Sequence, residues 1–256
     1  MPRWIIKVGS RTLIAGGPAL VRSWMRQVAV LRAQFGIDAV WVTSGAIATA
    51  VRLLGHRTTG LEFAEKQALC AIGQPAMMQL YEAALAAEGM RSAQVLVTAH
   101  DLENAELRQN LVTMLDTLRA WGAVPIVNEN DVAMQRNRKF KDNDWLAAML
   151  AGMLGAERLV LCTDVEGLYD ADPRVSPQAK VVPFVADLTD AALAAIDGAA
   201  GSGVSAGGMR SKMGAAREAV EHGSQTFIVK GDDPDVLLRL AAGGSVGTRI
   251  AAKSCA

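Results

Sequence analysis

The sequence predicts an α/β fold: an αβα sandwich around a central, mainly parallel β-sheet. Short runs rich in Val, Ile and Leu carry no polar alternation, and long amphipathic segments lie between them. Apolar runs without alternation are typical of strands covered on both faces. Strands that alternate with helices pair in parallel through right-handed crossovers, which gives the sandwich its layers.

The elements follow from these patterns in chain order. Apolar residues recur at three- and four-residue steps from Leu20 to Phe35 and from Leu107 to Trp121, which indicates two amphipathic helices. Further helices are expected after KDND, at residues 141–144, and from about Met209. Three prolines in residues 171–188 indicate turns or a hairpin. The expected strands are Trp4–Val8, Ala39–Thr43, Gln94–Val97, Val124–Val127, Leu159–Thr163 and Thr226–Val229.

Composition limits the class of protein. The chain has 256 residues, 51% of them hydrophobic, and a formal net charge of +0, which argues against a basic nucleic-acid-binding surface. Lys7 interrupts the N-terminal apolar run too early for a secretory signal, and no run is long enough to span a membrane. Cys70, Cys162 and Cys255 lack metal-ligand spacing and are interpreted as reduced thiols. We therefore expect a cytoplasmic protein without a nucleic-acid or membrane partner.

Polar residues follow four of the expected strands. They are Gly9-Ser10, Ser44-Gly45, the row Asn128 to Asp131, and Asp164. Any one of them could be a plain helix cap. Because ligands of open parallel sheets bind beyond the carboxyl ends of the strands, four such segments together predict a site. The acidic and carboxamide row at 128–131 indicates a cationic or hydrogen-bonding ligand.

Two lysines are candidates for binding phosphate. Lys7 lies inside an apolar strand, where its charge is costly unless it meets an anion, and Gly9-Ser10 beside it presents backbone N–H groups. The alternative is an edge strand from which Lys7 reaches water. Lys212 follows the Gly-rich stretch GSGVSAGGMRSK at 201–212. That stretch is neither a P-loop nor GxGxxG, and a linker is its alternative interpretation.

The remaining candidates carry carboxylates. Asp142 is expected to cap a helix, which places Asn143 and Asp144 in its first turn. Thr163-Asp164 end a strand where a nucleotide could lie. Two lysines with Gly-bearing turns and several carboxylates are the inventory of phosphoryl transfer, in which the protein positions and neutralises charge. No histidine stands in a catalytic motif, and no His/Cys cluster predicts a metal site.

The motifs KVGS, VTSGAIA, EKQALCAIGQ, VPIVNEND, KDND, TDVEGLYDADPR and GGMRSK, in this order, resemble the amino acid kinase family and its glutamate-phosphorylating members. The resemblance runs from Lys7 to about Thr248. It implies one kinase domain over 1–256, with an acceptor part at roughly 1–155, a nucleotide part at roughly 156–256 and no C-terminal PUA module. The implied reaction is transfer of the ATP γ-phosphate to the side-chain carboxylate of L-glutamate, giving γ-glutamyl phosphate for proline synthesis.

The resemblance also assigns residues. It implies that Lys7 and Lys212 meet the transferring phosphate and that Asp144 holds both lysines. Glutamate is expected at Ser44, Gly45, Asp131 and Asn143. Mg²⁺ is expected to arrive on the ATP phosphates, without a metal site on the protein. The implied ATP contacts are Lys7, Gly9, Ser10, Thr163, Asp164, Ala206, Gly207, Gly208, Met209, Arg210, Ser211 and Lys212.

Partners and alternatives complete the expectation. The resemblance implies a dimer or tetramer of identical chains and hand-off of the product to glutamyl phosphate reductase. Two departures from the family pattern are Lys141, in a basic run, and Ala206, where threonine is common. A related kinase acting on another carboxylate, a carbamate or a phosphate is one alternative. A non-catalytic amino-acid sensor is another, although such a sensor would be expected to lose Lys7, Asp144 or Lys212.

Overall fold

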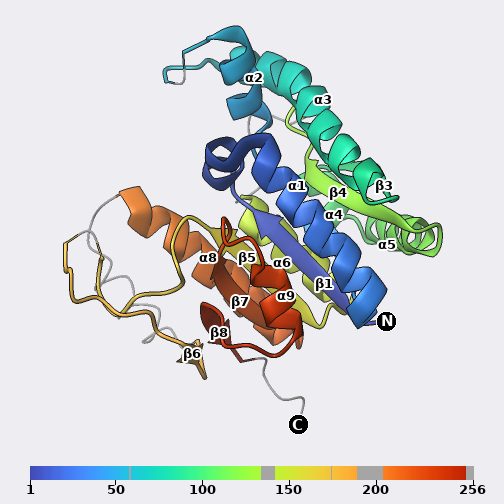
Figure 1. Ribbon diagram of the computed structural model, residues 1–256. Coiled ribbons are helices and arrows are strands. Elements are labelled where there is room, and N and C mark those ends of the chain that lie inside the picture. The colour runs from blue at the N-terminus through green and yellow to red at the C-terminus, as the bar shows by residue number, and fades with distance from the viewer. Residues whose placement is uncertain (58, 134–141, 174, 189–203, 252–256) are drawn as a thin grey trace.

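The computed structural model describes the chain except for residues 58, 134–141, 174, 189–203 and 252–256, and describes only the backbone of 204–207 (Figure 1). The expected basic run at 136–141 and Cys255 therefore lie outside the described residues. No helix of the described chain combines the length and the apolar character that a membrane span requires. The strands are β1 (Arg3–Val8), β2 (Asp38–Val42), β3 (Arg91–Val97), β4 (Ala123–Glu129), β5 (Arg158–Thr163), β6 (Phe184–Val185), β7 (Gln225–Lys230) and β8 (Thr248–Ile250).

The helices connect the strands in the expected alternation. Most are long, whereas α4 and α9 are short. They are α1 (Ser10–Phe35), α2 (Ala46–Leu54), α3 (Phe63–Ala87), α4 (Ala99–Glu103), α5 (Ala105–Ala120), α6 (Asn143–Met153), α8 (Val204–Glu221) and α9 (Val236–Ala241).

The described strands form one eight-stranded sheet in the order β3-β4-β2-β1-β5-β7-β8-β6. Every pairing is parallel except that of β7 with β8, which confirms the expected mainly parallel sheet. The six expected strands are all present, and each begins somewhat earlier than expected. The two short strands β6 and β8 were not predicted, because two or three residues are too few to show a period.

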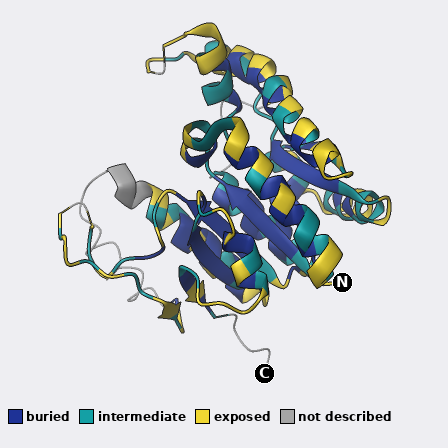
Figure 2. Cartoon of the chain, viewed as in Figure 1, coloured by how far each residue is buried: buried dark blue, intermediate teal, exposed yellow. Residues whose placement is uncertain are grey.

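The core lies in two layers, one on each face of the sheet, as the burial colours in Figure 2 show. Ile5 packs with helices α5, α6 and α8, whereas its neighbour Ile6 packs with α1, α3 and α9. Successive strand residues point to opposite faces, so a strand covered on both sides must be apolar throughout. This explains the absence of polar alternation in the sequence.

Two expectations about the second half of the chain have different outcomes. The turn-rich excursion is confirmed, because residues 168–170 pair with 180–182 through an antiparallel bridge between Tyr169 and Val181. The expected helix start near Met209 is wrong, because α8 begins at Val204. Lys212 thus lies deeper in the helix than its first turn or two. The glycines of GSGVSAGGMRSK led to the later estimate, since glycine lowers helix propensity.

Candidate active site

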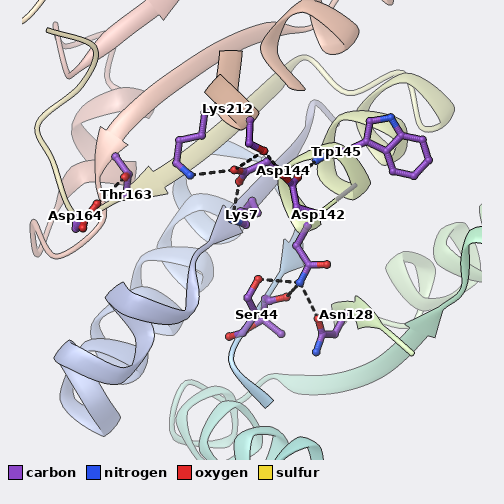
Figure 3. A network of polar contacts seen from close by, with 12 residues as sticks. Lys7, Ser44, Asn128, Asp142, Asp144, Trp145, Thr163, Asp164 and Lys212 are labelled. Carbon is purple, nitrogen blue, oxygen red and sulfur yellow. Dashed lines mark hydrogen bonds and ion pairs between the residues drawn. The ribbon is translucent and has the colours of Figure 1, made fainter. Parts of the chain in front are cut away.

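The centre of the site is a buried carboxylate between two ammonium groups. Lys7 comes from β1, Asp144 from the first turn of α6 and Lys212 from α8 (Figure 3). The Lys7 Nζ lies 2.5 Å from Asp144 Oδ1, and the Lys212 Nζ lies 3.0 Å from Asp144 Oδ2. The three residues are only 6%, 4% and 9% exposed, respectively. Each carboxylate oxygen therefore holds one ammonium group, and the excess of one positive charge remains for an anion.

Local structure explains how Asp144 reaches this position. Asp142 caps α6, since its Oδ1 accepts from the Trp145 backbone N–H at 2.9 Å, which confirms the expected N-cap. Ser211 of α8 donates to Asp142 and, at 3.4 Å, to Asp144. The sequence-based assignment placed Ser211 against the nucleotide, whereas its hydroxyl here joins α8 to the start of α6.

Burial and the neighbouring charges shift the pKa values of Lys7 and Asp144. Burial lowers the pKa of Lys7, although the Asp144 carboxylate opposes that shift. Burial alone would raise the pKa of Asp144, but the ion pairs with Lys7 and Lys212 outweigh it, so the pKa falls below its ordinary value of 3.8. Asp144 consequently stays ionised at neutral pH.

The lowered pKa of Asp144 predicts a loss of stability in acid. A carboxyl group whose pKa is lower in the folded protein stabilises it above the unfolded-state pKa. That contribution disappears as the pH falls through the lower folded-state value. We expect wild-type protein to lose unfolding free energy below about pH 4 more steeply than Asp144→Asn, which lacks this group. Urea melts from pH 6 to pH 2 measure this, and equal slopes for the two proteins would contradict it.

A network of amides lies at the acceptor end of the site. The Asn143 Nδ2 lies 2.8 Å from Ser44 Oγ and 2.9 Å from Asn128 Oδ1 (Figure 3). Ser44 and Asn143, two of the expected glutamate-binding residues, are thus brought together. Gly45 has a φ of 119°, a conformation that side chains with a Cβ rarely adopt, so glycine is required for the turn after β2.

Asp131, the remaining expected acceptor residue, is half-buried in the turn after β4. It is not among the residues that line the cavity described below. Burial raises the pKa of its carboxyl group, and a hydrogen bond from the Cys70 thiol opposes that rise. Its assignment to glutamate binding stays a prediction.

A cavity of about 420 Å³ joins the acceptor end to a second end. Ser44, Asn143 and Glu129 line the acceptor end, and Lys7 and Lys212 line the middle. The expected nucleotide residues among its lining are Lys7, Gly9, Ser10, Thr163, Asp164, Gly208, Met209 and Lys212. The two lysines therefore share one cavity, as a role in phosphate transfer requires.

Some expected nucleotide residues are not placed in the cavity. Arg210 and Ser211 belong to α8 but are absent from its lining. Ala206 and Gly207 lie in the first turn of α8, where the structure describes the backbone alone. Their contacts with a nucleotide stay predictions.

One lining residue, Arg11, escaped the sequence analysis, and it lies 3.8 Å from Asp164 in an exposed ion pair. Leu168, Tyr169 and Asp172, which belong to the motif TDVEGLYDADPR, line the same end. Arg11 follows the recognised Gly9-Ser10 turn directly, so its position next to a helix start was an available signal. Leu168 and Tyr169 lie in a loop whose path depends on its pairing with residues 180–182, which no local pattern shows.

Comparison with known proteins shows the family of this chain. Residues 2–230 match the profile of the amino acid kinase family. The curated glutamate 5-kinase of Variovorax paradoxus (strain S110) is 44% identical over 256 residues, covering 98% of this chain and 67% of that protein. The glutamate 5-kinase of Acidovorax ebreus (strain TPSY) is 44% identical over 259 residues, covering 98% of this chain and 68% of that protein. The chain thus spans about two thirds of the length of these relatives.

Solved structures share the fold at low sequence identity. An isopentenyl phosphate kinase superimposes with a TM-score of 0.65 and 19% identity, covering 97% of this chain and 100% of that one. UMP kinase from Bacillus anthracis superimposes with a TM-score of 0.64 and 16% identity, covering 99% of this chain and 97% of that one. These likenesses confirm the α/β fold.

Proposed function

The chain belongs to the amino acid kinase family, and on that premise we propose that it phosphorylates the side-chain carboxylate of L-glutamate with ATP. The product is γ-glutamyl phosphate, the acyl phosphate used in proline biosynthesis. The observation that carries the proposal is the Lys7–Asp144–Lys212 centre in a cavity with an acceptor end and a nucleotide end. The 44% identity to curated glutamate 5-kinases favours glutamate over the other acceptors of the family.

The transfer is an in-line attack by the substrate carboxylate on the γ-phosphorus. A glutamate side chain has a pKa of about 4.3, so its oxygen is already an ionised nucleophile at neutral pH and needs no general base. Negative charge spreads over the γ-phosphoryl oxygens during the transfer. Lys7 and Lys212 neutralise that charge, and Asp144 keeps both ammonium groups in place.

The N-terminus of α1 supplies further donors for the phosphates. Gly9 is the N-cap residue of the helix, and it has no side chain with which to cap the first backbone N–H groups. Gly9, Ser10, Arg11 and Thr12 all line the cavity. Uncapped N–H groups and the helix dipole together favour a phosphate there. Thr163, Asp164 and the loop beyond them are proposed to contact the nucleoside.

Mg²⁺ is proposed to enter with ATP. Within the described residues no three His, Cys, Asp or Glu side chains gather into a metal cluster. This fits an ion held mainly by phosphate oxygens and water, with carboxylates such as Asp164 at the cavity wall completing its surroundings. When bound, the ion adds positive charge against the phosphates.

The acceptor end suits an amino acid. Ser44 and Asn143 are proposed to bind the main-chain groups of glutamate, and the acidic Asp131 is proposed to meet its ammonium group. The acceptor part is proposed to comprise roughly residues 1–155, and the nucleotide part roughly 156–256. We also propose that the chain acts as a homo-oligomer and passes its unstable product to glutamyl phosphate reductase.

One assay tests the activity and the acceptor together. ATP consumption is measured with hydroxylamine present, in parallel reactions with glutamate, aspartate, N-acetylglutamate and carbamate. Hydroxylamine traps an acyl phosphate as a hydroxamate, so we expect hydroxamate with glutamate and background with the other three. Hydroxamate formed preferentially with aspartate or N-acetylglutamate, or ATP consumption supported by carbamate alone, would contradict the proposal.

A further inference from the structure

We propose that Gln74 of α3 is a positioning residue that sets the orientation of the Asn128 and Asn143 amides at the acceptor end of the cavity. The inference rests on the proposed function, because it assigns the acceptor end to an amino acid. Gln74 closes the motif EKQALCAIGQ, to which the reaction described above gives no role. Gln74 is 7% exposed and does not line the cavity, so it acts through its neighbours.

Four polar side chains from four different segments form a continuous chain of hydrogen bonds. The Asn128 Nδ2 donates to Gln74 Oε1 at 2.9 Å, and Asn143 Nδ2 donates to Asn128 Oδ1 at 2.9 Å. Asn143 Nδ2 also lies 2.8 Å from Ser44 Oγ and 2.8 Å from the Thr43 carbonyl oxygen. The relay thus runs from α3 through β4 and α6 to the turn after β2.

The Thr43 carbonyl oxygen determines which way every amide in this relay faces. A carbonyl oxygen only accepts, so the Asn143 nitrogen must face it. Thr43 itself is held in place, because its backbone N–H donates to Val127 at 2.9 Å and its hydroxyl meets Tyr81 at 2.9 Å. The Asn128 oxygen must then face Asn143, and its nitrogen must face an acceptor, which is the Gln74 oxygen.

Removing the acceptor oxygen at position 74 disturbs the orientation of the amides, starting with Asn128. The Asn128 nitrogen would be buried without a partner, since Asn128 is 2% exposed. Rotating Asn128 to satisfy it would place two amide nitrogens against each other at Asn143. The Asn143 Oδ1 is buried and has no partner among the described residues, although Asn143 itself lines the cavity. The order of the relay therefore holds Asn143 and Ser44 in one arrangement at the acceptor end, where the amino acid is proposed to bind.

Close packing of α3 against α2 holds Gln74 near Asn128. A Cβ atom at Gly73 would lie 1.8 Å from the Ala46 carbonyl oxygen, so only glycine allows α3 to approach α2 this closely. One turn earlier on α3, the Cys70 thiol donates to Asp131. Successive turns of α3 therefore contact polar residues at the end of β4 and in the turn after it, so α3 supports the acceptor site from behind.

Gln74→Met tests the role, because methionine keeps the volume and loses the acceptor. We expect the KM for glutamate to rise roughly 5- to 100-fold, the range for a buried donor left without a partner. The KM for ATP and kcat should each stay within about threefold, since the relay does not contact the nucleotide end. Gln74→Glu retains an oxygen facing Asn128 and should recover most of the glutamate affinity. Gln79→Met, on the exposed side of the same helix, is the matched control.

The outcomes separate this inference from the proposed function. If Gln74→Met and Gln74→Glu raise the glutamate KM equally, or if neither does, the orienting role is wrong. If Gln74→Met does not fold, Gln74→Asn replaces it, because the same amide on a shorter side chain cannot reach Asn128 and should raise the KM likewise. A glutamate KM for Gln74→Asn equal to that of wild type would overturn the inference. If wild-type protein phosphorylates a substrate other than glutamate, the proposed function is wrong. The role of Gln74 is then tested by measuring the KM of the same variants for that substrate.

Discussion

Replacing Lys7 or Lys212 with alanine is expected to lower turnover by about 10²–10³-fold, the loss caused by removing one donor to developing charge. The ammonium groups lie against the two oxygens of Asp144 and both lysines line the cavity, so we expect both to meet the same phosphate. The remaining lysine keeps Asp144 paired, and circular dichroism should show a folded protein. The KM for glutamate should change little, because the lost contact forms with the transferring group.

Lys66→Ala provides the control for this experiment. Lys66 is exposed on α3 and does not line the cavity that Lys7 and Lys212 share. Its side chain can therefore be removed without a change in turnover. Single-turnover measurements with ATP and glutamate distinguish slow chemistry from slow product release. Turnover near the wild-type rate in purified, folded Lys7→Ala or Lys212→Ala would refute the role of that lysine.

Asp144→Asn is expected to have a still broader effect, because it damages both stability and catalysis. The variant leaves two buried ammonium groups without their shared carboxylate, and breaking a buried pair in this way costs about 3–5 kcal/mol of unfolding free energy. Turnover should fall by at least about 10³-fold, since both lysines lose their position. The pKa of Lys7, which burial lowers and Asp144 raises, should fall further. Lys7 then loses its positive charge earlier as the pH rises. The fall in residual activity on the alkaline side should therefore occur at a lower pH than in wild-type protein.

A double variant separates the two effects of Asp144. In Asp144→Asn with Lys212→Met, one of the unpaired charges is replaced by an apolar side chain of similar length. Unfolding free energy should then recover by about 1–4 kcal/mol relative to Asp144→Asn, while turnover stays low. Chemical denaturation and the hydroxamate assay measure the two quantities on the same preparations. Recovery of turnover in the double variant would show that Asp144 acts on stability alone.

The sequence analysis predicted the strands well because their signal is local and strong. Trp4–Val8 and Leu159–Thr163 are mainly apolar runs followed by turn residues, and each agrees with the structure to within one residue at its start. Prediction was weaker where local preference and tertiary context disagree. The start of α8 is the example, because its glycines favour a loop while the packing of Met213 and Ala216 in the core favours a helix.

The candidate site was predicted in part, and charged residues were easier to recognise than neutral amides. Lys7 stands out because a charged group inside an apolar strand needs a partner, and the structure pairs it with Asp144. The family resemblance implied that Asp144 holds both lysines, and Lys212 is indeed paired with the same carboxylate. Asn128 stood out as the first residue of the polar row after its strand, but Gln74 did not, because a buried amide looks like any polar residue until its partner is known. Arg11 was missed for the same reason, since its place at the cavity depends on where α1 points.

The sequence by itself determined the order of strands and helices, the sheet edge that carries the site and the types of side chain available there. These follow from periodicity and turn residues, whose effects reach only a few positions along the chain. Only the tertiary structure decided which side chains meet. Asn143 contacts Thr43 and Asn128, and Asp144 contacts Lys7 and Lys212, across long sequence separations. Such contacts arise when packed layers bring distant segments together, and hydrogen bonds then select one orientation for each polar group.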